Sequence, residues 1–131
     1  EWKHSGRRAV YLKVLRNQQE PALQVFDAPD GIFTTPVRNV TTTSTQSLFM
    51  INGPWTLARA QTFAKRIGDD SSLTHEQRVA MAYALAFGRP PSETETSEAV
   101  NFLVLHAARS DEALVDLCHV LLNANEFLYV D

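Results

Sequence analysis

The cysteine and the four histidines are the residues best able to bind a metal or support covalent chemistry. The one cysteine, Cys118, is followed directly by His119, and the other histidines are His4, His75 and His106. Attachment of a c-type haem requires two thiols and an adjacent histidine, which one cysteine cannot supply. No two histidines are four residues apart, as a zinc-binding pair on one helix would be. The sequence therefore predicts no metal, haem or other cofactor in this chain, although His106 could meet Cys118 across the last two helices.

Hydroxyl and carboxyl side chains show no catalytic pattern either. The run TTTSTQS is dense in hydroxyls, but no G-x-S-x-G sequence places a serine on a sharp turn. The five glycines are too scattered to form a phosphate-binding loop. The carboxylate pairs, Asp69 with Asp70 and Glu93 with Glu95, stand in helix-entry regions, where the helix dipole accounts for them. We therefore expect no catalytic residue, and the sequence favours a protein that is not an enzyme.

Charged and amide side chains at the edges of apolar strings are predicted to tie the fold together. Arg89 follows an expected helix end, where its guanidinium can bond the last carbonyls or a carboxylate such as Glu126 or Glu95. Asn125 continues the apolar stripe of the last helix, so we expect it to point inward and to bond free carbonyls there. Asp27 lies in the FDAPD turn, within reach of an arginine. The predicted ties are thus Asp27, Arg89, Asn125 and Glu126.

The basic front half supports a second interpretation of its arginines. Residues 1–66 carry nine basic and four acidic side chains, whereas residues 67–131 carry three basic and eleven acidic ones. Such polarity indicates an acidic partner for the front half, or two halves that face each other. Arg16 or Arg38 could hold Asp27, or the front half could form an anion or ligand cleft. The candidates for that cleft are Arg7, Arg8, Arg16 and Arg38.

The elements that must position these residues are helices. Apolar spacing and capping residues predict a short helix over 45–51 and longer ones over 54–67, 75–87 and 93–109. A last helix is expected to be capped by Ser110. Gly68 and Gly88 are expected to end two of them, and the helix after Thr74 is expected to be central and buried. The fold class is therefore predicted as all-α, a compact bundle of four main helices plus a short one.

The N-terminal third is predicted to be irregular. It is rich in Pro, Gly, Ser and Thr, which favour turns over long elements. Residues 9–17 fit either a short strand or a helical turn. We expect one domain over 1–131, in which 1–43 wraps a helical core of 44–131 and Phe26 anchors the wrap. The longest apolar run of the whole chain, residues 79–87, has nine residues, which is too few for a membrane span of ~20.

Three aromatic residues could form a sugar-stacking platform if they were exposed side by side. They are Trp2, Tyr11 and Trp55. We expect Trp55 to belong to the core instead. The chain starts without methionine and shows no signal-peptide pattern, so we expect a piece of a longer protein.

An ordered series of motifs resembles a known family. The motifs include RRAVYLKVLRN, FDAPDG, VRNVTTTSTQSLFMINGP and LLNANEFLYVD. Together they are similar to the planctomycete-specific C-terminal domain of unknown function of the DUF 1553 type, from about Arg7 to Asp131. The stretch TTTSTQSL lacks the proline usual there, and VRN replaces a pair of arginines. The resemblance implies the end of a large exported, multidomain protein, periplasmic or extracellular, with a c-type cytochrome domain upstream and no known activity.

The function expected from these features is that of a non-catalytic helical module for docking or ligand binding. Its expected partners are upstream domains of the same protein, and also glycans or another exported protein. Scattered basic residues and the implied location argue against nucleic acid. The alternative is part of an enzymatic or carbohydrate-binding site that an upstream domain completes.

Overall fold

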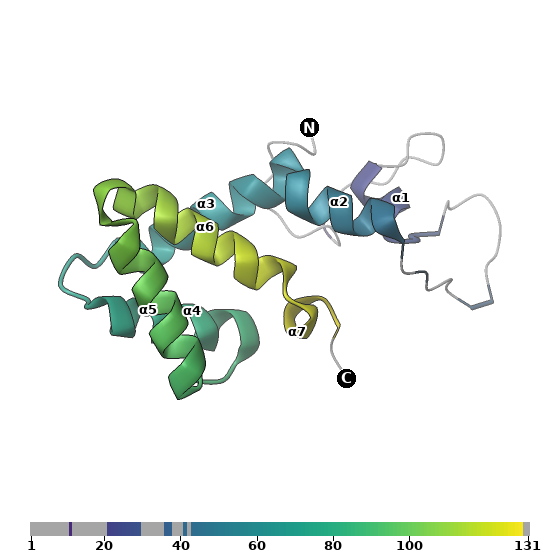
Figure 1. Ribbon diagram of the computed structural model, residues 1–131. Coiled ribbons are helices and arrows are strands. Elements are labelled where there is room, and N and C mark those ends of the chain that lie inside the picture. The colour runs from purple at the N-terminus through teal and green to yellow at the C-terminus, as the bar shows by residue number, and fades with distance from the viewer. Residues whose placement is uncertain (1–10, 12–20, 30–35, 38–40, 42, 130–131) are drawn as a thin grey trace. The chain divides into compact units, whose positions relative to one another are not determined.

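The computed structural model describes residues 11, 21–29, 36, 37, 41 and 43–129, and every regular element in these ranges is a helix (Figure 1). The all-α class is confirmed for this part of the chain. The elements are α1 (Pro21–Val25), α2 (Ser44–Asn52), α3 (Pro54–Gly68), α4 (His75–Phe87), α5 (Glu93–Leu105), the 3-10 turn η3 (Ala107–Arg109), α6 (Ser110–Asn123) and α7 (Asn125–Leu128).

The chain divides into two compact units, Glu1–Phe49 and Met50–Asp131. The expectation of a single domain stays a prediction. Among the described residues, no helix combines the length and the apolar character that a membrane span requires.

The first unit contains α1, which was not expected from its turn-rich sequence. Proline suits the first helical position because no intrahelical bond uses its missing N–H. Phe26 lies directly after α1 and meets Phe49 edge to face, with ring centroids 6.0 Å apart. Gln46 adds a bond from Nε2 to the carbonyl of Val25, at 2.9 Å. Within this unit, Phe26 therefore acts as an aromatic anchor. The short strand considered for residues 9–17 lies outside the described residues, Tyr11 excepted.

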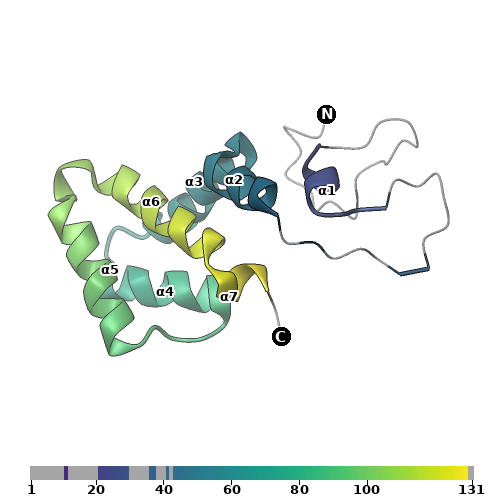
Figure 2. The ribbon, with the colours of Figure 1, turned by 45° about the vertical axis from the view of Figure 1, so that its right-hand side comes forward.

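The core of the second unit forms mainly between α3 and α6. The predicted inward face of α3 was Ala60, Phe63, Ala64 and Ile67. It is confirmed, since Phe63 is half-buried against the core and the other three are buried. The predicted stripe of α6 is confirmed by its buried side chains, which include Leu114, Leu117, Cys118 and Leu121. Figure 2 shows α5 rising from the loop after α4, and α6 running back above α4 towards α7. Spacing of 3.6 residues per turn thus places one apolar face of each helix in a shared core.

Local capping signals in the sequence are confirmed at two helices. The Thr74 hydroxyl accepts the N–H of Gln77, and the Gln77 side chain accepts the N–H of Thr74. Ser92 and Glu95 make the same reciprocal pair at the start of α5. Gly88 ends α4 with a left-handed φ of 72°, which a side chain would strain. Capping residues of this kind can be predicted from the sequence because each depends only on neighbours along the chain.

Two expected helix boundaries are wrong, and a third is right in position but not in geometry. The helix expected to reach Arg109 ends at Leu105, and the turn η3 follows it. Ser110 does not cap α6 but is its first residue, and no side chain bonds the free N–H groups there. The helix α3 does end at Gly68, within one residue of the expected end, but its C-cap is the right-handed Asp69, so Gly68 is not a left-handed stop. A serine or a glycine near a boundary fits several positions, so its type alone does not fix the end.

The expectation that α4 is the central, buried helix is also wrong. Leu85 on α4 is 39% exposed, and only Val79, Ala82 and Tyr83 of this helix are buried. The helix in contact with α3, α4, α5 and α7 is α6. Small alanines make α4 apolar on every side, but a bundle of this size covers only one of its faces.

Candidate functional site

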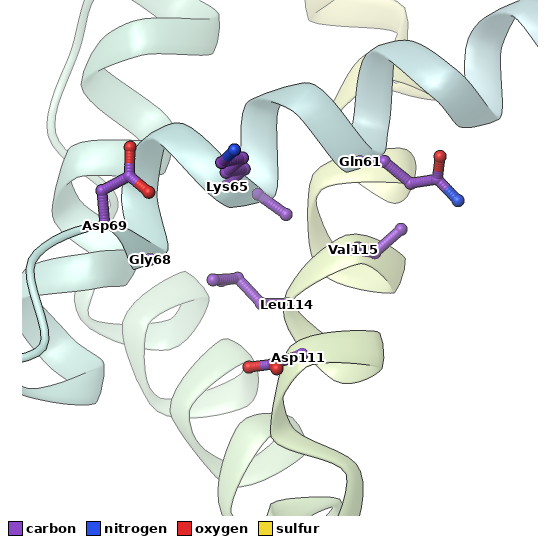
Figure 3. Close-up of a pocket in the computed structure, with 8 residues that line it drawn as sticks. Gln61, Lys65, Gly68, Asp69, Asp111, Leu114 and Val115 are labelled. Atoms are coloured by element: carbon purple, nitrogen blue, oxygen red, sulfur yellow. The ribbon is translucent and has the colours of Figure 1, made fainter.

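A groove opens between the last turns of α3 and the first turns of α6 (Figure 3). Its volume is about 320 Å3, at the lower end of the range usual for small-ligand pockets. Residues on α3 reach it because they recur at helical spacing along one side of that helix. The lining residues are Gln61, Ala64, Lys65, Gly68, Asp69, Asp111, Leu114 and Val115.

The floor of the groove is apolar. Ala64 and Leu114 are buried there, and Val115 is half-buried. Figure 3 shows the Leu114 side chain pointing from α6 towards Gly68. A β-carbon at Gly68 would stand 3.5 Å from Leu114 Cδ2, an ordinary contact distance, so the glycine keeps this end of the groove open. An apolar surface of this kind suits aliphatic groups of a ligand.

The walls of the groove carry three charged side chains, Lys65 and Asp69 from α3 and Asp111 from α6. All three are exposed. Among the described residues, no ion pair or hydrogen bond joins any of these three side chains to another group of the chain. Their charges are therefore available to a bound ligand. The groove combines an apolar floor with uncommitted charges at its edge.

A second cluster of charges lies where α4, α5 and α7 meet, and it is fully engaged. Arg89 Nη1 and Nη2 donate to the two carboxylate oxygens of Glu95 at 2.9 and 2.8 Å. Arg89 Nε and Nη2 donate to the two oxygens of Glu126 at 2.6 and 2.7 Å. The guanidinium carbon also lies 5.6 Å from the ring centroids of Tyr83 and Phe87. Two bidentate pairs and two aromatic rings fix this arginine as a connector of three helices.

The electrostatics of the cluster follow from these bonds. Hydrogen bonds from Arg89, and from the backbone N–H of Ser92, lower the pKa of Glu95 to about 2. The hydrogen bond from Arg89 also lowers the pKa of Glu126, and the two carboxylates raise the pKa of Arg89. All three groups stay ionised at neutral pH. Because none of them exchanges a proton in that range, the cluster is suited to holding helices and not to acid–base chemistry.

The comparison with known families identifies the chain. The model of a family described as PSD1, Protein of unknown function (DUF1553), matches residues 1–103. The chain belongs to the DUF1553 family. No curated protein matches it, and no solved structure does. The match ends within α5, so the resemblance that we extended to Asp131 is shown over residues 1–103. In this DUF1553 chain the α3 wall of the groove lies inside the match, and the α6 wall lies beyond it.

The predicted ties of the DUF1553 chain are placed as follows. Arg89 and Glu126 bond each other, with Glu95 as the second carboxylate. Asp27 Oδ2 accepts hydrogen bonds from the N–H and the hydroxyl of Thr41, at 2.8 and 2.6 Å. The backbone of Asp27 itself has a positive φ of 55°. The arginines considered for Asp27 and for the anion cleft lie outside the described residues. They are Arg7, Arg8, Arg16 and Arg38.

The expected inward position of Asn125 is wrong. The helix α6 ends at Asn123, and Asn125 is exposed as the first residue of α7. Asn123 makes the kind of bond that we expected from Asn125, because its Nδ2 donates to the carbonyl of His119 at 2.8 Å. The apolar stripe was extended two residues too far, past the point where Ala124 leaves helical geometry.

Sequence reasoning missed the part played by His119. Its Nε2 lies 3.1 Å from the carbonyl oxygen of Met50, near the end of α2. In a continuing helix that carbonyl would accept the N–H of residue 54, but Pro54 has none. The pattern of a proline four residues after Met50 was the available signal, since it predicts a carbonyl that needs another donor.

The thiol and the other histidines form no reactive site in the described part of the DUF1553 chain. Cys118 is fully buried, and this burial raises the pKa of its thiol to about 12. A thiol in that state is a poor nucleophile and a poor metal ligand. His106 lies against the ring of Phe102, with centroids 4.8 Å apart. No three His, Cys, Asp or Glu residues gather there as metal ligands.

Trp55 does not belong to the core, contrary to expectation. Its side chain is 38% exposed, and the guanidinium carbon of Arg59 lies 5.7 Å from its ring centroid. The buried residue of this first turn of α3 is its neighbour Thr56. Trp55 precedes the inward face by one position, so the helical period carries it to the surface.

Proposed function

We propose that this DUF1553 chain is a non-catalytic helical module that docks a partner segment in the groove between α3 and α6. The observation that carries the proposal is the set of uncommitted charges around an apolar floor. Lys65, Asp69 and Asp111 have no internal partner among the described residues, whereas Arg89, the arginine between α4 and α5, is bonded to two carboxylates. Groups used inside the fold stabilise it, and groups left at a groove are free to recognise something else.

The chemistry of the described side chains supports docking over catalysis. The Cys118 thiol is buried and protonated at neutral pH, so it offers no nucleophile. The carboxylates with lowered pKa values, Glu95 and Glu126, already accept bonds from Arg89. A catalytic pocket normally brings such perturbed groups to a cavity, and here they lie in the helix connection instead.

The setting of the module is part of the same proposal. We infer an exported, periplasmic or extracellular protein of several domains, for which the support is the family resemblance of the motifs. In that setting the docked segment belongs to another domain of the same protein or to another exported protein. A c-type haem would then belong to another domain of the longer protein.

Site-specific crosslinking in the longer protein tests the proposal. A photoreactive amino acid replaces Gln61 at the rim of the groove in one variant and Glu98 on the exposed side of α5 in another. The proposal expects one defined crosslinked peptide from position 61, identified by mass spectrometry, and none from position 98. Equal yields at the two positions, or no crosslink from position 61, would contradict it.

Carbohydrate binding is the second candidate, and the exposure of Trp55 is the observation that favours it. An exposed indole can stack on the apolar face of a sugar ring. A panel of neutral and sulfated glycans, added during thermal unfolding, tests this function. A glycan at one hundred times its Kd should stabilise the chain by about 2.7 kcal/mol, and Trp55→Ala should abolish the shift.

A further inference from the structure

The two carboxylates of the α3–α6 groove approach it from different helices. Asp69 is the C-cap of α3, and Asp111 stands in the first turn of α6. Figure 3 shows them on opposite sides of the groove, with Leu114 between them. Both are exposed, and neither forms an ion pair within the described chain. A group that enters the groove between them meets negative charge from two sides.

The backbone adds to the negative character at the α3 wall. The carbonyl end of a helix carries a partial negative charge, and α3 ends at Gly68, inside the groove. The opposing N-terminus of α6 is partly positive, but Asp111 and Glu112 stand in that first turn and offset it. Lys65 is the one positive side chain that lines the groove, so the lining side chains carry a net charge of −1.

The floor of the groove restricts which cation fits. Ala64, Leu114 and Val115 present hydrocarbon, which a small hydrated ion does not use. Lysine and arginine side chains combine an aliphatic stem with a charged head, and they lay the stem on apolar surface while the head meets polar groups. This division matches a groove with hydrocarbon below and carboxylates at the sides.

We propose that the groove receives a lysine or arginine side chain of the docked segment, with its stem on Leu114 and its charged head between Asp69 and Asp111. The inference rests on the proposed docking function and names the chemistry of the partner. Lys65 repels an incoming cation, since its positive charge lines the same groove. Its removal therefore favours binding.

The test is a titration of the 131-residue chain, followed by the NMR shifts of the backbone amides. The probes are two acetylated and amidated tripeptides, leucine-arginine-leucine and leucine-citrulline-leucine, because citrulline keeps the shape of arginine without its charge. We expect shifts at Gly68 and Leu114 with the arginine peptide, and binding at least about fivefold weaker with the citrulline peptide. Added salt should weaken the binding of the arginine peptide but not that of the citrulline peptide.

Matched variants complete the test. The double variant Asp69→Asn/Asp111→Asn should lose the preference for arginine, and Lys65→Gln should bind the arginine peptide more tightly. Glu93→Gln/Glu98→Gln makes the same charge change on α5 and should retain wild-type binding. Equal binding of the two peptides would overturn the inference and leave the docking groove standing. Shifts from neither peptide would also overturn it, and the crosslinking at position 61 would then decide the proposed function alone.

Discussion

The imidazole of His119, on α6, bonds the carbonyl of Met50 at the point where α2 gives way to α3, with 3.1 Å between Nε2 and the oxygen. Because a carbonyl oxygen only accepts, Nε2 must carry the hydrogen of this bond. Met50 is buried, and Thr56 places its hydroxyl 3.9 Å from the Met50 sulfur. The bond therefore links Met50, just before the boundary between α2 and α3, to α6.

Removing this bond should destabilise the chain. In His119→Leu the Met50 carbonyl keeps its buried position without a donor, which costs about 1–2 kcal/mol of unfolding free energy. His119→Gln provides an amide donor and should recover part of the loss. Urea unfolding followed by circular dichroism measures both variants. If His119→Leu unfolds at the wild-type midpoint, the bond does not contribute to stability.

The ion cluster at Arg89 should give the chain a specific dependence on acid. The pKa of Glu95 is lowered to about 2 in the fold, against an ordinary value of 4.5. A lowered pKa means that the stabilisation is complete above pH 4.5 and is lost as the pH falls towards 2. The lowered pKa of Glu126 acts in the same direction. The thermal midpoint of the wild type should therefore fall steeply below pH 4.5.

Two arginine variants separate this cluster from general acid effects. Arg89→Gln should be less stable at pH 7 and should show a shallower loss between pH 4.5 and 2. Arg109→Gln removes the same charge from exposed pairs with Glu112 and Asp116 and should retain the steep loss. Parallel pH profiles for Arg89→Gln and the wild type would be incompatible with the assigned pKa shifts.

The two glycines expected to end helices should respond in opposite ways to alanine. Gly88 has a φ of 72°, so Gly88→Ala should cost about 1 kcal/mol. Gly68 is helical, and a β-carbon there has ordinary contacts, so Gly68→Ala should be neutral or stabilising by up to about 1 kcal/mol. Denaturant midpoints of the two variants provide the comparison. The assigned geometry is wrong if Gly68→Ala proves the more harmful change.

Serine substitutions test where α5 and α6 begin. Ser92 caps α5 through the N–H of Glu95, so Ser92→Ala should lower the unfolding free energy by about 1 kcal/mol. Ser110 is the first helical residue of α6 and caps nothing, so Ser110→Ala should stay within about 0.5 kcal/mol of the wild type. If Ser110→Ala lowers the unfolding free energy as much as Ser92→Ala does, then Ser110 is the cap of α6, as the sequence predicts.

Features that depend on near neighbours could be predicted from the sequence. The caps at Thr74 and Ser92, and the left-handed Gly88, depend on neighbours a few residues away, so residue type and spacing were sufficient. The inward faces of α3 and α6 followed from helical period in the same way. Glu95 and Glu126 were considered as alternative partners of Arg89, but only the meeting of α4, α5 and α7 brings both to it.

Features that depend on packing between distant segments could not be predicted from the sequence. The contact between His119 and Met50 spans 69 residues. The exposure of Trp55 depends on which side of α3 the rest of the unit covers, and residue type alone favoured the core. The groove depends on the crossing of α3 and α6 and on a glycine where they approach. Gly68 was visible in the sequence only as a helix stop.

Hydrogen exchange of the α3 and α6 amides, compared between the 131-residue chain and the proposed longer protein, tests the docking proposal most directly. Mass spectrometry of peptides covering residues 61–69 and 111–115 reports the protection of the two groove walls. The account predicts slower exchange at both walls in the longer protein, and unchanged exchange in the peptide of α5 that contains Glu98. Equal exchange of the groove peptides in the two forms would contradict the docking groove.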